Sequence, residues 1–374
     1  MRTVKIASTG AHLPGEPLTN ADLERLGGPL PPEILEGIQV QTRHWLVDPE
    51  TGEHREANSE MATAAGRVAL ARAGLDPLDI DLLIVSTASP DFPLPPMATL
   101  VQDQLGLRRC TSLEVRSGCA GAVEALDIAR TYIERGTHSN ALVIGSEAIS
   151  PLLVPIYQDI EPHKIRMRDR IGLYTFGDGA GAILLQAAEP GETRGVLAAS
   201  AASVGGGRKP GMQIVGAGTH APLRRQMQAK RPVDLRIDVV ASATHTPAVI
   251  AEALSDLLGM GGLSAQDVSA CILPEGNAGY LTDELEAAGI DTAHWDGLAG
   301  RVLENLADVG ATGSAAVPIA LDHAWQAGKL APGDLVMLLA IETSKWKYAG
   351  MILPWTAPMP AAADARAAAA AAAA

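Results

Sequence analysis

The residue best suited to covalent chemistry in this sequence is Cys119, in the segment Ser117-Gly118-Cys119-Ala120-Gly121-Ala122. A β-branched run precedes the segment and a helical pattern follows it, so the cysteine is predicted at the start of a helix that comes directly after a strand. Unpaired N–H groups and the helix dipole stabilise a thiolate at such a place. We therefore predict that Cys119 is a nucleophile. The alternative is a small, inert residue packed at a helix start.

Composition indicates a large α/β protein that acts on small molecules. The chain has 374 residues with 47% hydrophobic and only 3% aromatic content, which suits packed helices and buried strands. A net charge of −14 and the lack of a Lys/Arg cluster argue against a nucleic-acid partner. The three cysteines, Cys110, Cys119 and Cys271, follow no disulfide or zinc spacing, so we expect no metal and a reducing cytoplasm.

The two ends of the chain carry no predicted catalytic role. The first six residues are expected to form a short strand rather than a signal peptide, and no apolar run has membrane length, so no membrane contact is expected. Residues 357–374 are rich in alanine and close on eight consecutive alanines. We expect this tail to be disordered or artefactual.

Strand and helix patterns alternate along the chain, which predicts parallel strands joined by crossover helices. Strands are expected at 82–86, 112–115, 141–144, 182–185, 270–273, 302–306 and 335–340, and helices at 59–73, 123–135, 248–258 and 317–327. The segment that begins at Gly118 recurs at Gly313, each time with a helix and a strand behind it. We therefore expect two duplicated halves, residues 1–188 and 189–356.

Four motifs in a fixed order resemble the ketoacyl-acyl-carrier-protein synthase III family. They are the Ser-Gly-Cys-Ala-Gly helix start, Tyr174-Thr175-Phe176-Gly177-Asp178-Gly179-Ala180-Gly181-Ala182, Pro274-Glu275-Gly276-Asn277-Ala278, and Gly310-Ala311-Thr312-Gly313-Ser314-Ala315-Ala316. The resemblance runs from residue 1 to about Trp355. It implies the five-layer αβαβα thiolase fold, a homodimer, and an acyl group carried on Cys119. The implied donor is a thioester of coenzyme A or of the phosphopantetheine arm of an acyl carrier protein, with no permanently bound cofactor.

The chain departs from the family at two catalytic positions. Glu275 stands where the family has the histidine of a Cys-His-Asn triad, and Ala311 replaces the asparagine. Decarboxylative condensation needs hydrogen bonds to a thioester enolate, which a carboxylate would repel. A cysteine with a base can still pass an acyl group to a hydroxyl or an amine. We predict that His294, in an insertion before Gly310, is this base and that Glu275 orients it. The alternatives are that His294 is a surface histidine and that Glu275 is a solvated carboxylate in a loop.

Two further site residues rest on the resemblance. Arg170, six residues before Phe176, matches the family arginine that contacts coenzyme A or the carrier-protein arm, and it is otherwise one charge on a solvated face. The family's Gly-rich oxyanion loop is replaced here by Ile341-Glu342-Thr343-Ser344. The backbone N–H groups of Cys119 and Ser344 are predicted to form the oxyanion hole.

The sequence therefore predicts an acyltransferase of secondary metabolism, for example of polyketide, aminocyclitol or sugar antibiotics, that acylates oxygen or nitrogen through Cys119. One alternative is a decarboxylative condensing enzyme that makes starter units. The other is a non-catalytic synthase partner, although it would have no reason to keep a nucleophile.

Overall fold

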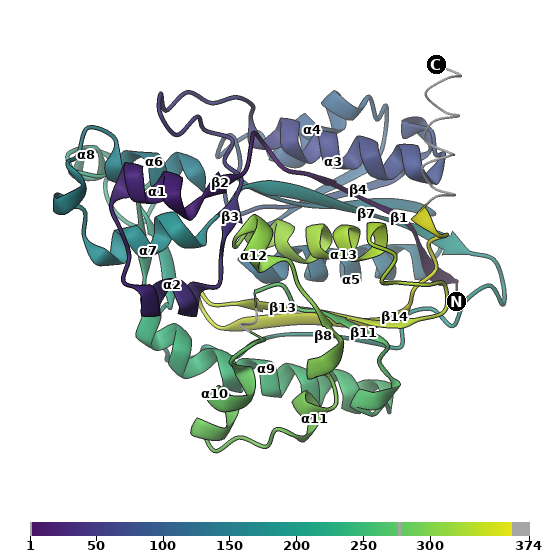
Figure 1. The fold of residues 1–374 in the computed structure, drawn as a ribbon. Helices are drawn as coiled ribbons and strands as arrows, with labels where there is room; N and C mark the ends of the chain where they lie inside the picture. The colour runs from purple at the N-terminus through teal and green to yellow at the C-terminus, as the bar shows by residue number, and fades with distance from the viewer. Residues whose placement is uncertain (1, 276–277, 361–374) are drawn as a thin grey trace.

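A computed structural model describes residues 2–275 and 278–360, which contain two five-stranded sheets. Figure 1 shows these sheets stacked between layers of helices. The first sheet has the order β1 (Thr3–His12), β7 (Gly179–Ala188), β6 (Asn140–Glu147), β4 (Leu82–Ser86) and β5 (Thr111–Val115). The second has the order β12 (Val302–Leu303), β11 (Ala270–Ile272), β13 (Leu335–Glu342), β14 (Lys347–Pro354) and β8 (Ala198–Ser203).

Helices fill the space between the sheets and cover both outer faces (Figure 1). The central layer is α5 (Gly121–Glu134) with α13 (Ala316–Gln326). One outer layer is α3 (Asn58–Ala73) with α4 (Met97–Leu105), and the other is α9 (Val239–Gly261), α10 (Leu281–Ala287) and α11 (Ala293–Asp296). The predicted five-layer αβαβα arrangement is confirmed.

The two sheets have the same plan, as a duplication requires. In each sheet the second strand in chain order forms two parallel pairs: β4 with β5 and β6 in the first sheet, and β11 with β12 and β13 in the second. The boundary predicted after residue 188 coincides with the end of β7. The predicted parallel strands are confirmed at these pairs, but β7 runs antiparallel to both neighbours and β14 returns antiparallel from β13 through a tight turn.

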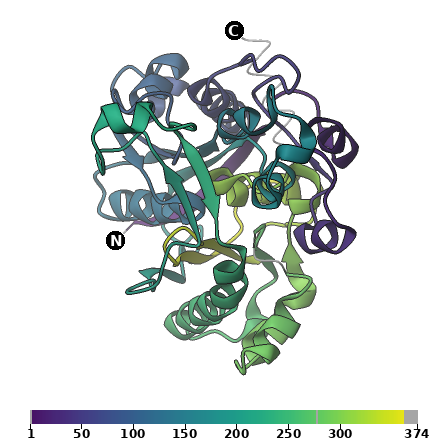
Figure 2. The ribbon, with the colours of Figure 1, turned by 90° about the vertical axis from the view of Figure 1, so that its left-hand side faces the viewer.

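The remaining elements cluster at one end of the layers, on the face that Figure 2 presents. They are β2 (Leu18–Thr19), α1 (Asn20–Gly27), α2 (Pro32–Ile38), β3 (Thr42–Arg43), α6 (Ser150–Tyr157), α7 (Met167–Thr175), β9 (Met212–Val215), α8 (Leu223–Met227), β10 (Asp234–Ile237) and α12 (Leu306–Val309). Single 3₁₀ turns occur at η1 (Pro77–Asp79), η2 (Gly118–Ala120), η3 (Pro162–Lys164), η4 (Ala265–Asp267), η5 (Ala299–Arg301) and η6 (Gly313–Ala315). The antiparallel β9–β10 ribbon was not predicted from the sequence.

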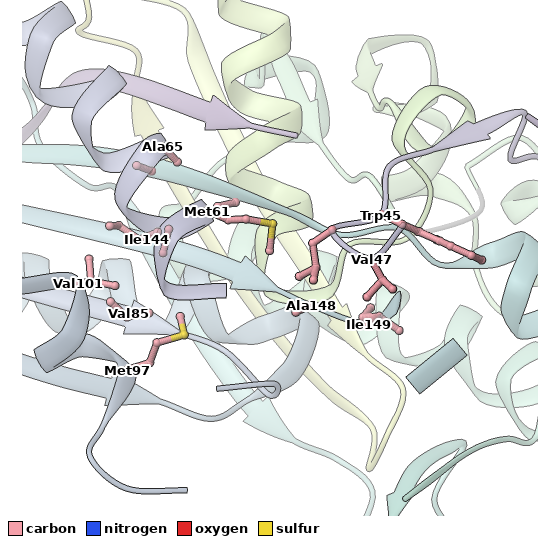
Figure 3. Packing of buried hydrophobic residues seen from close by; sticks show 14 of the residues in the cluster. Trp45, Val47, Met61, Ala65, Val85, Met97, Val101, Ile144, Ala148 and Ile149 are labelled. Atoms are coloured by element: carbon pink, nitrogen blue, oxygen red, sulfur yellow. The ribbon is translucent and has the colours of Figure 1, made fainter. Parts of the chain in front are cut away.

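Aliphatic side chains make three cores, one on each side of the central layer and one within it. In the first core, α3 and α4 lie on the outer face of the first sheet, and Figure 3 shows Met61 and Ala65 of α3 near Ile144 of β6. In the central core, α5 and α13 contact both sheets.

The two halves of the chain contact each other closely at Gly145, where there is no room for a side chain. A Cβ atom on Gly145 of β6 would lie 2.0 Å from the backbone oxygen of Ser314 on η6. No side chain fits there without moving the second half of the chain away from the first.

We predict that Gly145→Ala lowers the free energy of unfolding by about 3 kcal/mol, as overpacking of a rigid core does. Gly206→Ala is the matched control, since a Cβ on Gly206 meets nothing within 4 Å. Urea denaturation of both variants measures the difference. Equal midpoints for the two variants would contradict the proposed close contact.

Within the described residues, no helix combines the length and the apolar character needed to cross a membrane. The tail predicted at 357–374 begins with packed residues, because Ala357 is buried and the Trp325 indole N–H donates to the Pro358 carbonyl at 2.8 Å. The predicted disorder of 361–374 lies outside the described residues.

Candidate active site

Cys119 lies on η2, between the end of β5 and the start of α5, as the strand-to-helix prediction requires. Its counterpart in the second half is Ser314 on η6, which precedes α13 in the same way. The preceding glycines share one conformation, with φ of 51° at Gly118 and 54° at Gly313. The two turns meet: the Ser314 hydroxyl donates to the Gly118 carbonyl at 2.7 Å. The nucleophile therefore lies on the pseudo-two-fold axis that relates the halves.

The Cys119 thiol hydrogen-bonds to the carboxyl group of Glu275. The second half holds that carboxyl group in place, since the Gly313 N–H donates to Glu275 Oε1 at 3.0 Å. The structure thus brings together two of the three residues predicted to be catalytic. Burial raises the pKa of Glu275 to about 7, so this carboxyl group exchanges protons near neutral pH.

The Cys119 thiol is not activated in the way that its helix-start position suggests. Burial, followed by the negative charge of Glu275, raises the pKa of Cys119 well above the usual range of a thiol. The predicted stabilisation of a thiolate by the helix start is therefore wrong, because burial and, after it, the nearby carboxyl groups favour the neutral thiol. Cys119 is a neutral thiol at rest, and it needs a base to react.

The predicted oxyanion N–H groups do lie together, but a side chain of the protein fills the place between them. The Cys119 N–H donates to Glu342 Oε2 at 2.6 Å, and the Ser344 N–H donates to Glu342 Oε1 at 2.5 Å. Glu342 is only 2% exposed. Gly118 allows this approach, because a Cβ there would lie 1.6 Å from Glu342 Oε2.

A third carboxyl group, Glu147, completes an acidic ring around the thiol. Glu147 ends β6 as Glu342 ends β13, and the shift in residue number that relates Gly118 to Gly313 also relates Glu147 to Glu342. Glu147 accepts a hydrogen bond from the Ala88 N–H at 2.5 Å. Burial raises its pKa to about 8, with a smaller contribution from the charges of the other two glutamates.

A cation close to this turn is Lys347, on β14. Its ammonium group pairs with Glu124 at 2.6 Å and hydrogen-bonds to the hydroxyl of Ser117. Its charge is therefore used at the start of α5. No ion pair to Glu342 or Glu147 is found among the residues that the structure describes, so no cation offsets the effect of burial, which raises the pKa of Glu147.

His294 is not beside Cys119. It is exposed on α11, the short helix that packs on α9 in an outer layer, whereas Cys119 lies directly before α5. Figure 1 shows α5 in the central layer and α11 at the outer edge. The neighbouring Trp295 anchors this helix, being 1% exposed and donating its indole N–H to Thr282 at 3.1 Å. This placement does not support His294 as the base, since the aromatic anchor turns it away from the core.

Arg170 lies on α7 and is bound to backbone carbonyls. Its guanidinium group donates to Pro29 O at 3.1 Å and to Pro162 O at 2.6 Å. These contacts hold α7 against the α1–α2 connection. No described contact commits Arg170 to a ligand, so its assignment to a coenzyme A or carrier-protein arm stays a prediction.

The two remaining motifs have structural explanations. Ala311 pairs with the backbone around Phe176 and brings no side-chain donor to the site. Asp178, in the Phe-Gly-Asp-Gly signature, is fully buried and accepts hydrogen bonds from the N–H groups of Leu46, Ile149 and Ser150. Burial raises the pKa of Asp178 to about 6. The signature therefore fixes the fold rather than the chemistry.

A cavity of about 920 Å³ opens between α6, the loop that follows it and the β9–α8–β10 segment. Cys119 is not among the residues that line it, but a group of basic residues is: Lys164, Arg166, His220, Arg225, Lys230, Arg231 and Arg236. The sequence prediction that no Lys/Arg cluster exists was wrong, because folding gathers cations that are dispersed along the chain. Arg225 and Lys230 have no carboxylate partner among the described residues.

No metal centre is apparent in this part of the chain: across residues 2–275 and 278–360, no set of three or more His, Cys, Asp or Glu side chains has an arrangement that could hold an ion.

A cysteine at a strand-to-helix turn between two like halves is typical of thiolase-fold enzymes that act on acyl thioesters. Two family models match, 3-oxoacyl-[acyl-carrier-protein] synthase III over residues 113–205 and its C-terminal part over residues 258–355. A third, for the FAE1/type III polyketide synthase-like proteins, overlaps at 41–157. The chain belongs to the 3-oxoacyl-[acyl-carrier-protein] synthase III family, whose substrates are thioesters of coenzyme A or acyl carrier protein.

Individual relatives agree with this assignment. The β-ketoacyl-[acyl-carrier-protein] synthase III of Rhizorhabdus wittichii is 33% identical, over 91% of this chain and 96% of its own length. The Rhodospirillum centenum enzyme of the same name is 32% identical, over 90% of this chain and 94% of its own. Among solved structures, a tetronic acid condensing enzyme is 29% identical with a TM-score of 0.78, covering 94% of this chain and 100% of its own. The Pseudomonas aeruginosa synthase III, at 24% identity and TM-score 0.76 over 96% and 100%, shares the fold.

Sequence reasoning missed the acidic ring. Glu342 was visible as a charged residue in place of a glycine in the oxyanion loop, and that substitution was the available signal. Glu147 ends a buried strand, and only the repeat, extended as far as residue 147, would have paired it with Glu342. Neither position could be assigned to the thiol without the packing of the two halves.

We predict that Glu147→Gln makes the protein less sensitive to alkaline pH. A glutamate titrates near 4.3 in an unfolded chain and near 8 here, so the folded state holds the proton more tightly and stability falls as pH rises through 8. The glutamine variant should gain about 3 kcal/mol relative to the wild type between pH 5 and pH 9. Urea midpoints measure this. The exposed Glu36→Gln is the control, and an equal pH dependence in all three proteins would refute the assignment.

Proposed function

We propose that the protein is an acyltransferase in which Cys119 takes an acyl group from a thioester and Glu275 moves the protons, with a hydroxyl or amine as the final acceptor. The contact between the Cys119 thiol and the Glu275 carboxyl group carries this proposal. A neutral thiol beside a base whose pKa is near 7 meets the requirement for base-assisted nucleophilic catalysis.

The reaction balances with these two groups alone. Glu275 takes the proton of the Cys119 thiol as the sulfur attacks the thioester carbonyl carbon. The donor's thiol then leaves with that proton, and an acyl-Cys119 thioester remains. In the second half, Glu275 accepts the proton of the acceptor's O–H or N–H as oxygen or nitrogen attacks the acyl carbon. The C–S bond breaks, and the sulfur of Cys119 regains its proton from Glu275.

The site is poorly suited to decarboxylative condensation. That reaction develops negative charge on a thioester enolate, which hydrogen-bond donors must stabilise. Glu275, Glu342 and Glu147 place carboxyl groups around the thiol, and Ala311 offers a methyl group where the family has an amide. A malonyl group would also bring a further carboxylate into this acidic ring. An uncharged acyl group, followed by a neutral or cationic acceptor, meets no such repulsion.

The basic cavity beside α8 supports a donor that carries phosphate. Coenzyme A and the phosphopantetheine arm both do, and an acyl carrier protein adds acidic surface. In a chain with a net charge of −14, this cavity offers Arg225 and Lys230, which have no carboxylate partner among the described residues, whereas its Arg236 is paired with Asp234. We also propose, as the sequence predicts, that this acyl transfer belongs to secondary metabolism.

A second candidate is a condensing enzyme that forms a carbon–carbon bond. The observation in its favour is the 29% identical structure described as a tetronic acid condensing enzyme, which matches 94% of this chain. Products separate the two candidates. Acyl-Cys119 that passes its acyl group to amines or alcohols supports acyl transfer to a heteroatom, whereas release of carbon dioxide from malonyl-acyl-carrier protein contradicts it.

The first test is acylation of Cys119, followed by intact mass after incubation with acyl-coenzyme A or acyl-carrier protein. Glu275→Gln should slow adduct formation about 10²–10³-fold, as expected for loss of a general base. The amide oxygen can still accept the Gly313 N–H, so the fold is kept. His294→Ala is the matched control and should stay within about twofold of the wild type, since it is exposed. Loss of acylation in His294→Ala alone would reverse the assignment of the base.

The acylation rate should increase with pH through about 7. Glu275 must be ionised to accept the thiol proton, and its pKa is raised to about 7, so the rate falls below that pH as the carboxyl group becomes protonated. A pH profile of adduct formation measures this step. The increase in rate through about pH 7 should be kept in Glu147→Gln and lost in Glu275→Gln. A profile governed by a step below pH 5 in the wild type would contradict this role for Glu275.

A further inference from the structure

The place between the Cys119 and Ser344 N–H groups is the point in this site where a thioester carbonyl oxygen would receive two backbone hydrogen bonds. In this structure each N–H donates to a different oxygen of the Glu342 carboxyl group, at 2.6 Å and 2.5 Å. An oxyanion and this carboxylate need the same donors. They cannot hold them at the same time.

We infer that Glu342 is an internal occupant of the oxyanion hole, which a donor must displace before Cys119 can be acylated. Glu342 thereby selects for donors that are held elsewhere on the protein by a long, anchored arm. The inference rests on the proposed function only in taking Cys119 as the residue that is acylated. It holds for either kind of final acceptor.

The space between the two N–H groups fits the carboxyl group of Glu342. Gly118, with φ of 51° and no side chain, leaves the space that Glu342 Oε2 occupies. No cation of the described residues pairs with Glu342, so its two backbone donors are the contacts that hold it. A group held by two hydrogen bonds is displaced at moderate cost, which is what a reversible occupant requires.

The pseudo-symmetry supplies an independent comparison. Glu147 occupies the equivalent strand end in the first half, and its charge also acts on Cys119, but it accepts from the Ala88 N–H rather than from the nucleophile. The two glutamates are thus matched in residue type, strand position and burial, and they differ in the N–H groups from which they accept. Replacing each in turn separates the effect of charge on the thiol from the effect of occupancy.

The test uses the full chain and two reagents. Acetyl-N-acetylcysteamine, a short thioester, needs the oxyanion hole to acylate Cys119, whereas iodoacetamide alkylates the thiol without one. The ratio of acylation rate to alkylation rate corrects for any change in thiol reactivity. In Glu342→Ala this ratio should increase about tenfold, because the two N–H groups become available. In Glu147→Gln it should stay within about twofold of the wild type, because charge alone changes both rates together.

Glu342→Gln provides a second variant if Glu342→Ala folds poorly. An amide has only one acceptor oxygen, so its NH₂ group would face one of the two N–H donors and the occupant would be held less tightly. The ratio should therefore lie between those of the wild type and Glu342→Ala. In both variants the advantage of acyl-coenzyme A over the short thioester should shrink.

The outcomes are distinct. A ratio that falls in Glu342→Ala and Glu342→Gln, with unchanged urea midpoints, overturns the inference and makes Glu342 an activating residue. A ratio that rises equally in Glu147→Gln overturns it too, since charge would then explain the effect. The absence of any Cys119 adduct in the wild type and all variants refutes the proposed function itself, whereas normal wild-type acylation with an unaltered ratio refutes only the role of Glu342.

Discussion

The contact between the two 3₁₀ turns at the pseudo-two-fold axis is the constraint on which the site depends. Ser314 donates its hydroxyl to the carbonyl of Gly118, and shares a second hydrogen bond of 3.1 Å with Ser86. Gly145 lets the backbone of η6 lie against β6. Because these contacts join the halves at the residue before the nucleophile, the second half can place Glu275 and Glu342 against a thiol that belongs to the first.

This arrangement concentrates carboxyl groups where a buried site disfavours charge. Ionising all of Glu147, Glu275 and Glu342 together would be costly, so protons are retained and the pKa values of Glu147 and Glu275 rise to about 8 and 7. The same environment keeps Cys119 protonated. The site therefore differs in kind from a thiolate–imidazolium pair: its nucleophile becomes reactive only while a proton is being transferred, and its chemistry is tied to that transfer.

Much of the fold could be predicted because local patterns and the repeat agree. The buried strand at 82–86 and the helix at 59–73 match β4 and α3 to within a residue, since continuous apolar runs and regular helical spacing are local signals. The strand β14 and the β9–β10 ribbon were missed. Lys347–Pro354 is almost continuously buried and therefore shows no alternation, and the short, partly exposed strands of the ribbon carry weak periodicity. Antiparallel pairing around β7 depends on connections between elements, which no local window contains.

The site was only partly predictable for a related reason. Cys119 and Glu275 could be found because they stand in motifs. Position in the chain favoured His294 as the base. In the structure it is the neighbouring Trp295 that is buried, and His294 is exposed. Glu342 and Glu147 belong to strand ends and reach the thiol only through the packing of one half on the other, a relation between distant segments that spacing does not encode.

Asp178, in the Phe-Gly-Asp-Gly signature of the family, has a structural role that is separate from the site around Cys119. Its carboxyl group ties together three backbone N–H groups from two separate segments, at distances of 2.5 to 2.9 Å. It takes no part in the acidic ring. The residue that identifies the family and the residues around the thiol are therefore different ones. Substitutions among Glu147, Glu275 and Glu342 can change the chemistry of the site while Asp178, and with it the family signature, stays the same.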